Sequence, residues 1–180
     1  MNDYAKNRIF GDSFMPAAKS VLKGIYSAEM DISIASDKLD TKEASDLILH
    51  GAKSKILNDG DRVAVRVRKH GYADRYPNEF TIRSRAMFGG ETEYNKIMSG
   101  MGDFFLYAHA EQIKHEFARW LLIDLANFRY AIENMKIPKE SKSNFDGTRF
   151  YAFNIYDFPP TLDLVVAGSH AMESRQVGLF

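Results

Sequence analysis

The alternation of hydrophobic and polar residues predicts helices and strands in turn along the chain. Asp12 or Ser13 can cap a helix, and apolar residues recur after them at helical spacing, so residues 15–28 are predicted to be helical. Residues 91–99 are predicted to form a second helix, because their apolar positions share one face and Gly100 follows at once. Each helix is therefore expected to cover a core with one face.

Seven further segments have the composition of strands, with alternating or continuous apolar residues. The predicted strands are residues 46–50, 62–68, 79–85, 103–108, 120–125, 148–157 and 162–167. Two of them, 103–108 and 120–125, are apolar almost throughout, which is typical of strands covered on both faces. This pattern predicts an α/β fold with a central mixed β-sheet flanked by helices.

The segment between those two apolar strands is less regular. Residues 110–119 are predicted to be helical, although a single long helix over residues 120–135 competes with a strand at 120–125. No repeat or low-complexity linker interrupts the chain. We therefore expect a single domain over residues 1–180, with its core over residues 13–167 and a loose tail at residues 168–180.

Composition narrows the classes of function. The chain has 180 residues, 45% of them hydrophobic and 27% charged, so it can build a full core without disulfides. It has no cysteine, which excludes thiolate zinc sites, iron–sulfur clusters and cysteine nucleophiles. Its five histidines are scattered, which argues against a transition-metal site. The polar start and the short apolar runs predict a cytoplasmic protein without a signal peptide or membrane span.

The charges balance overall but are separated along the sequence. Lys and Arg together number 24, and so do Asp and Glu. Residues 29–46 hold six carboxylates against two lysines, whereas residues 62–85 hold seven basic residues against two acidic ones. The basic segment is therefore a candidate surface for an anionic partner.

Four arginines of the basic segment are expected to converge. Because side chains alternate along a strand, Arg66 and Arg68 share one face of their strand, and Arg83 and Arg85 share one face of the next. If the two strands pair in register, the four guanidinium groups meet on one surface and need anions there. Phosphates suit the planar guanidinium, and the protein's own carboxylates suit it as well. Both interpretations stay open at this point.

The order of these segments resembles that of the PD-(D/E)XK nucleases, also called restriction-endonuclease-like. In that superfamily a helix that often carries Glu precedes a strand led by a metal-binding Asp, and the next strand carries Glu-x-Lys. Here the helix end with Glu29, the strand opened by Asp46 and the strand at residues 62–68 are similar to these elements. The likeness covers roughly residues 13–130, and it implies a restriction-endonuclease-like fold that acts on nucleic acid.

The resemblance breaks at the Glu-x-Lys strand, which reads Arg-Val-Arg here. Phosphodiester hydrolysis in this superfamily uses Mg²⁺ held by carboxylates and a cation beside the attacking water. The resemblance implies that Asp46 and Glu29 hold Mg²⁺ or Mn²⁺ and that Arg68 stands in for the lysine. Arg66 cannot bind Mg²⁺, so Glu93 is a candidate for the missing carboxylate.

Taken together, these features predict a nucleic-acid-binding protein whose partner is DNA or RNA, with Mg²⁺-dependent nuclease activity. The predicted nucleic-acid contacts are Arg66, Arg68, Arg83 and Arg85. The predicted catalytic residues are Asp46, Arg68 and Glu93. A fold that binds nucleic acid without cutting it is equally consistent. The alternative is a non-catalytic, phage-encoded interaction protein whose arginine face binds an acidic protein partner, and a homodimer is compatible with either interpretation.

Overall fold

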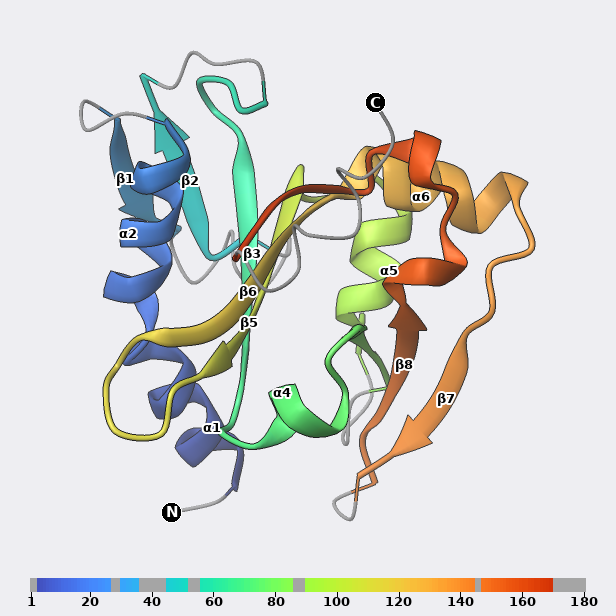
Figure 1. The fold of residues 1–180 in the computed structure, drawn as a ribbon, viewed down its shortest axis with the longest axis horizontal. Coiled ribbons are helices and arrows are strands. Elements are labelled where there is room, and N and C mark those ends of the chain that lie inside the picture. Colours follow the sequence, from blue (N-terminus) through green and yellow to red (C-terminus); the bar gives the residue numbers. More distant parts are fainter. Residues whose placement is uncertain are drawn as a thin grey trace.

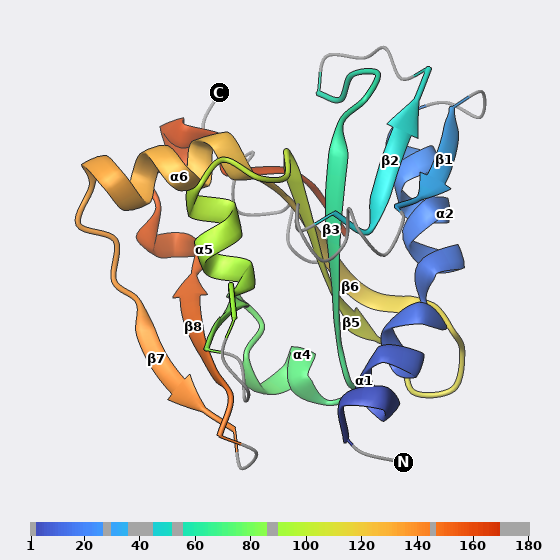
Figure 2. The same ribbon diagram turned by 180° about the vertical axis from the view of Figure 1, so that it is seen from behind.

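A computed structural model shows an α/β fold of two β-sheets with helices around them (Figure 1). The structure describes residues 3–26, 30–35, 45–51, 56–85, 90–144 and 147–169. The chain opens with helices α1 (Asp3–Asp12) and α2 (Met15–Tyr26). Both lie at one side of the molecule, away from the smaller of the two sheets, and the front and back views agree on this placement (Figures 1 and 2).

The large sheet has six strands and mixed pairing. In spatial order its strands are β1 (Asp31–Ile34), β2 (Leu47–His50), β3 (Arg62–Arg68), β5 (Phe104–Ala110), β6 (Phe117–Asp124) and β9 (Val165–Gly168). β3 and β5 run parallel, and the other neighbouring pairs are antiparallel. All seven residues of β5 are buried, as its continuous apolar sequence predicts for a strand covered on both faces.

A second sheet of three strands faces one side of the large sheet. Its antiparallel strands are, in order, β4 (Glu79–Arg85), β8 (Arg149–Asn154) and β7 (Glu140–Ser143). The short helix α4 (Tyr72–Arg75) connects β3 to β4. In Figure 1 helix α5 (Glu93–Met98) lies between the two sheets, and helix α6 (Leu125–Asn134) lies above the small sheet. Two 3-10 turns, Ile155–Asp157 and Pro160–Leu162, lead from β8 to β9.

The hydrophobic core lies on both faces of the large sheet. On one face Leu22 of α2 packs with Leu106 and its neighbours. On the other face Phe80, Phe128 and Phe153 form an aromatic cluster, with ring centroids 5.1–5.9 Å apart. This cluster joins the small sheet to α6, because the three rings come from β4, α6 and β8, and Phe80 also meets Tyr107 of β5 in the large sheet, with ring centroids 6.5 Å apart. The small sheet is thereby fixed over the face of the large sheet opposite to α2.

Local sequence signals explain why helices α5 and α6 begin where they do. The hydroxyl oxygen of Thr92 accepts a hydrogen bond from the N–H of Asn95 (3.3 Å) and caps α5. The carboxylate of Asp124 accepts one from the N–H of Asn127 (2.8 Å) and caps α6. Gly100 follows α5 with a φ of 93°, a conformation that glycine adopts easily and that lets the chain turn toward β5.

The predicted α/β class and the mixed sheet flanked by helices are confirmed. The predicted strands at 62–68 and 79–85 coincide with β3 and β4, and the predicted helices coincide with α2 and α5 to within a few residues. The remaining predicted strands overlap β2, β5, β6, β8 and β9. Of the predicted loose tail, Gly168 belongs to β9, and residues 170–180 lie outside the described residues.

Two predictions about the region after β5 are wrong. Residues 111–116 form the turn between the antiparallel strands β5 and β6, and β6 begins at Phe117, so no helix spans 110–119. The competing long helix is also wrong over its first part, because β6 runs to Asp124 and α6 starts at Leu125. Antiparallel neighbours need only a short turn between them, and the charged residues of this turn imitate a helix surface.

Two strands, β1 and β7, were not predicted. Each has only four residues and carries serine or charged side chains, so neither shows a strong apolar pattern. Both lie at the edge of a sheet, where a strand is covered less and needs fewer apolar residues.

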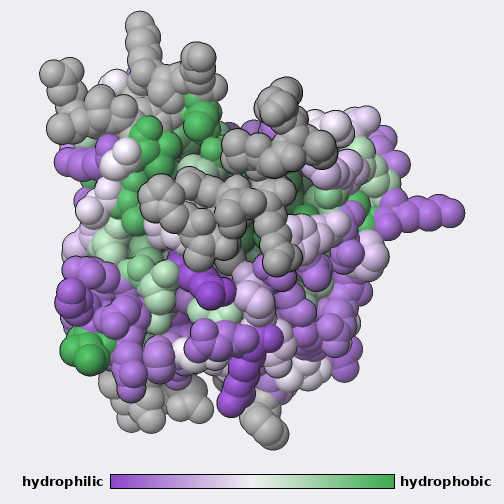
Figure 3. Space-filling view, in the orientation of Figure 1, coloured by the Kyte–Doolittle hydropathy of each residue, from purple (hydrophilic) through white to green (hydrophobic). Residues whose placement is uncertain are grey.

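The surface is polar over much of one face. The lower half of the face seen in Figure 3 is mostly hydrophilic, and hydrophobic residues gather at its upper left. Within the described ranges, no helix is long and apolar enough to cross a membrane.

Candidate functional site

β3 places two predicted site residues, Arg66 and Arg68, on the face of the large sheet that looks toward the small sheet. Ala64, two residues before Arg66, belongs to the core cluster between the sheets, so the alternating side chains point the same way. In the parallel register with β5, Arg66 lies opposite Tyr107 and Arg68 lies opposite His109. The predicted alternation along this strand is therefore correct, and the two arginines lie beside a tyrosine and a histidine.

Arg66 is paired with Glu93, another predicted site residue, which lies in the first turn of α5. Nη1 of Arg66 lies 3.0 Å from Oε2 of Glu93, and the two side chains are 16% and 22% exposed. The same oxygen accepts a hydrogen bond from the backbone N–H of Arg83 (2.9 Å). Glu93 therefore links β3 of the large sheet to β4 of the small sheet.

The four arginines do not converge through strand pairing as the sequence predicts. β4 pairs with β8, while β3 pairs with β2 and β5, so Arg83 and Arg85 belong to the small sheet. Both are exposed, and Arg85 lies opposite the exposed Arg149 in the antiparallel register of β4 and β8. The predicted pairing is wrong because the connection through α4 carries the chain from one sheet to the other. Glu93 nevertheless brings Arg66 close to the backbone of Arg83.

Asp46 lies near the start of β3, far along the strand from Arg68. Its carboxylate accepts a hydrogen bond from the backbone N–H of Val65, and three residues of an extended strand, about 10 Å, separate Val65 from Arg68. No ion pair joins Asp46 to Arg66 or Arg68. Glu29 lies outside the described residues. Among the described residues no group of three or more His, Cys, Asp or Glu could hold a metal ion.

Arg68 lies near two aromatic rings. Its guanidinium carbon lies 4.4 Å from the ring centroid of Tyr72 and 5.7 Å from that of Phe150. Burial lowers the pKa of Arg68 from its ordinary value, but a guanidinium stays protonated in proteins. No described carboxylate lies within ion-pair distance of it, in contrast to Arg66. Arg68 is thus a partly buried cation with two aromatic rings beside it and no counter-ion among the described residues.

A pocket of about 220 Å³ adjoins Arg68 in the space between the two sheets. Its walls come from β3 and β5 on one side, from β4, β7 and β8 on the other, and from α4. The residues that matter most for its chemistry are Arg68, Tyr72, Thr81, Tyr107, His109 and Phe150. The pocket therefore combines a cation, hydroxyl groups and aromatic walls.

His109 lies in the wall of this pocket and is 1% exposed. Both of its ring nitrogens are buried, and neither has a hydrogen-bond partner among the described residues. Burial, reinforced by the positive charges of Arg68 and Arg119, lowers the pKa of His109 to about 4. At neutral pH His109 is therefore a neutral imidazole with one unpaired donor and one unpaired acceptor.

Tyr107 and Thr81 connect the two sheets within the pocket. The hydroxyl oxygens of the two residues lie 3.5 Å apart, and burial raises the pKa of Tyr107. The ring of Tyr107 meets the ring of His109 edge-on at 5.3 Å. These polar groups are packed closely against each other, so a ligand would find them already in place.

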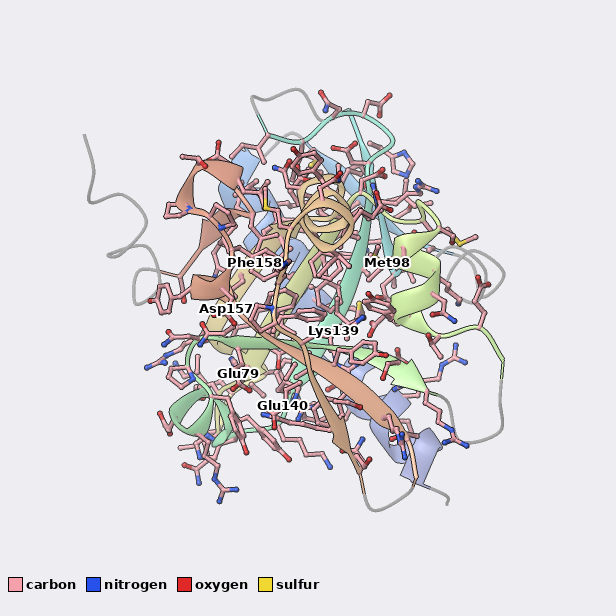
Figure 4. All side chains as sticks on the ribbon, turned by 90° about the vertical axis from the view of Figure 1, so that its right-hand side faces the viewer. Glu79, Met98, Lys139, Glu140, Asp157 and Phe158 are labelled. Carbon is pink, nitrogen blue, oxygen red and sulfur yellow. The ribbon has the colours of Figure 1, made fainter. Side chains whose placement is uncertain are left out.

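Lys142 adds a second cation at the pocket, but carboxylates neutralise it. Its Nζ lies 3.2 Å from Glu79 and 3.0 Å from Glu140, and it also lies over the ring of Tyr76 at 4.9 Å. Figure 4 shows Glu79 and Glu140 close together on the small sheet. Partial burial opposes the charge of Lys142, but Glu140 and Glu79 raise its pKa. The uncompensated positive charge at the pocket is therefore that of Arg68.

No protein-family model, curated protein or solved structure matches this chain. The pocket was not predicted from the sequence, because its residues come from strands and a helix far apart along the chain. One signal was present: His109 interrupts an otherwise apolar strand that is buried on both faces. A polar side chain in such a strand needs a partner and so marks a place where the core is not purely apolar.

Proposed function

We propose that the protein binds a phosphate-bearing ligand in the pocket between its sheets, with Arg68 as the principal contact. The observation that carries this proposal is the guanidinium of Arg68 at the pocket wall, near two rings and without a described counter-ion. A partly buried charge without a counter-ion is unfavourable, and a bound anion would relieve that cost. The charge of Arg68 would therefore lower the stability of the protein without ligand and favour the binding of an anion.

Phosphate chemistry suits the groups around Arg68. The planar guanidinium makes bidentate hydrogen bonds to phosphate oxygens, and Arg68 lines the pocket with two aromatic rings beside it. The hydroxyl groups of Tyr107 and Thr81 add donors within the same pocket. Aromatic walls at Tyr72 and Phe150 favour a ligand with a planar ring, as in a nucleotide.

The resemblance to PD-(D/E)XK nucleases adds nucleic acid to the candidate ligands, and a restriction-endonuclease-like topology remains part of this proposal. Hydrolysis is less well supported than binding. A metal at Asp46 would lie about 10 Å along β3 from a phosphate on Arg68, whereas hydrolysis needs both at one phosphorus atom. Glu93 is occupied by Arg66 and by the N–H of Arg83. We therefore propose binding as the function and leave Mg²⁺-dependent cleavage as the prediction of the resemblance.

A second candidate function is binding of an acidic protein partner by the exposed arginines of the small sheet. Arg83, Arg85 and Arg149 are exposed on neighbouring strands, and no described carboxylate pairs with them. Like charges on adjacent strands repel each other, so an acidic surface would stabilise this arrangement. This surface is distinct from the pocket wall at Arg68, which allows the two functions to be tested separately.

Titration calorimetry at low salt tests the first proposal, with inorganic phosphate and adenosine monophosphate as probes. We expect both to bind, with affinity that falls as salt rises. Arg68→Met should weaken binding by about 10- to 100-fold, because it removes charge-assisted hydrogen bonds. Arg8→Met makes the same chemical change on exposed α1, away from the pocket, and should leave the affinity unchanged.

Three outcomes decide between the candidates. Absence of binding at low salt, or binding that Arg68→Met leaves unchanged, would overturn the pocket as a phosphate site. A polyglutamate peptide that binds wild-type protein and Arg68→Met equally, but fails to bind Arg83→Met/Arg85→Met, would instead favour the acidic partner. Circular dichroism of each variant would show that a loss of binding is not a loss of fold.

A further inference from the structure

We propose that the pocket takes a terminal phosphate, that of a nucleotide or of the end of a nucleic-acid strand, and excludes the phosphodiesters within a strand. This inference rests on the proposed function and adds which phosphate is recognised. It follows from the size of the pocket, from its closed wall at β5, from the charge at Arg68 and from a second hollow beside it.

The size of the pocket limits what enters it. A volume of about 220 Å³ accommodates a phosphate with part of a sugar or a ring. A duplex or a continuous strand running through the space between the sheets needs far more room. The occupant is therefore a small molecule or the end of a larger one.

The wall at β5 closes the pocket on the side of the large sheet. Tyr107 and His109 line it there, and β5 is buried at each of its residues, between β3 and β6. A strand that entered toward Arg68 would meet this wall and could not continue past it. A terminal group can enter such a pocket, whereas an internal phosphodiester would have to carry both of its neighbouring nucleotides inside.

The charge at Arg68 also favours a terminal phosphate. A phosphate monoester carries about −1.5 to −2 charges near neutral pH and three free oxygens, more than a diester or a carboxylate offers. The pocket can use them, since Arg68 lines it together with Tyr107 and Thr81, whose side chains carry hydroxyl groups. Glu79, which also lines the pocket, is already paired with Lys142 at 3.2 Å.

A second hollow adjoins the first at Tyr72 and has the chemistry to hold the next nucleotide. It measures about 140 Å³ and is lined by His70, Gly71, Tyr72 and Arg75. The ring of Tyr72 is shared by both hollows and stacks with that of Tyr76 at 6.3 Å. A strand whose end phosphate binds Arg68 would thus pass over aromatic rings toward the exposed Arg75.

Fluorescence anisotropy with three labelled oligothymidylates of equal length tests this inference. One carries a 5′-phosphate, one a 3′-phosphate and one no terminal phosphate. We expect at least one phosphorylated form to bind wild-type protein about 10-fold or more tightly than the form without a terminal phosphate. In Arg68→Met that preference should disappear, and in Arg8→Met it should remain.

The outcomes separate this inference from the function on which it rests. If all three strands bind alike and all depend on Arg68, the pocket holds internal phosphates, and the terminal preference is overturned while phosphate binding stands. If neither the strands nor adenosine monophosphate bind at low salt, both proposals fall. If a peptide with a free C-terminal carboxylate displaces adenosine monophosphate and its amidated form does not, the pocket selects a carboxylate terminus, which overturns the terminal phosphate as its ligand.

Discussion

The space between the two sheets has two ends that differ in what fills it. Around α6 the rings of Phe80, Phe128 and Phe153 pack against one another with almost no exposure. At the other end, next to α4, the same space contains a pocket lined by Arg68 and His109. One pair of sheets thus has a closed, apolar end that holds them together and an open, polar end where Arg68 and His109 lack counter-ions or hydrogen-bond partners among the described residues.

This difference separates stability from binding within one layer. Apolar burial at the closed end supplies free energy of folding, roughly in proportion to the area removed from water. At the open end, Arg68 lacks a described carboxylate partner, and His109 has two nitrogens without a described hydrogen-bond partner, which lowers stability. Substitutions at the two ends should therefore move stability and ligand affinity in different ways.

The largest effect is expected at the closed end. Phe128→Ala removes a fully buried ring that contacts Phe80, Phe153 and Phe158, and it should lower the free energy of unfolding by about 3–5 kcal/mol. Urea denaturation followed by circular dichroism measures this change. Phosphate affinity of the folded fraction should stay within about twofold of the wild-type value, because no atom of the pocket is removed.

Tyr130→Ala on the same helix is the matched control for Phe128→Ala. Tyr130 is 54% exposed, so its removal should change the free energy of unfolding by about 0.5 kcal/mol or less. If the two variants were equally stable, the aromatic cluster would not be what holds the two sheets together. The contrast between a closed and an open end would then lose its energetic basis.

The second effect is a pH dependence that arises at the open end. The pKa of His109 is about 4 in the folded protein and about 6.5 when exposed, so the unfolded chain binds a proton between these values that the folded chain does not. Stability should accordingly fall by about 3 kcal/mol as the pH decreases from about 6.5 to 4 and gain nothing from this residue above that window. The positive charges of Arg68 and Arg119 favour the neutral form of His109, whereas the negative charge of Asp74 favours its protonated form.

Comparison with His109→Leu isolates this contribution, because carboxylates titrate over part of the same range in both proteins. The free energy of unfolding, measured in urea at several pH values, should depend less steeply on pH in the variant than in the wild type. At pH 7 the variant should be as stable as the wild type or more stable, since it lacks two buried polar atoms without described partners. Equal pH slopes would show that His109 is protonated or hydrated in the folded protein.

Much of the fold was predictable because its central elements have strong local signals. The strands β3 and β4 were predicted with their observed bounds, since valine alternates along the first and apolar residues occupy the centre of the second. The edge strands β1 and β7 were missed because edge positions need few apolar residues. Which strands pair was not predictable, because α4 takes the chain to a second sheet and no local pattern encodes that change.

The site was only partly predictable for the same reason. Arg66, Arg68 and Glu93 were singled out by charge and order, and the structure places Arg66 and Glu93 in contact while Arg68 lies at the pocket. The partners of Arg68 could not be inferred, because Tyr72 and Phe150 are far apart in sequence and meet through the packing of two sheets. Residue types can indicate which side chains take part in a site, but the tertiary structure is needed to show which of them lie together.

The smallest effect concerns Arg66 and Arg68 of β3, which differ in whether a described carboxylate accompanies them. Glu93→Gln keeps the size of the side chain but removes the charge that pairs with Arg66, and the pair is only partly buried, so the loss should be about 1–2 kcal/mol in urea denaturation. Arg68→Met should cost nothing or stabilise the apo protein slightly, because it replaces a cation that lacks a described counter-ion with an apolar chain near two rings. The double variant Arg66→Met/Glu93→Gln should recover part of the loss, since Arg66 would no longer be left without its partner.

If Arg68→Met destabilised the protein as much as Glu93→Gln does, Arg68 would be a structural residue held by the native fold. The open end would then be as satisfied as the closed one, and the pocket would lose the unpaired charge that makes it an anion site.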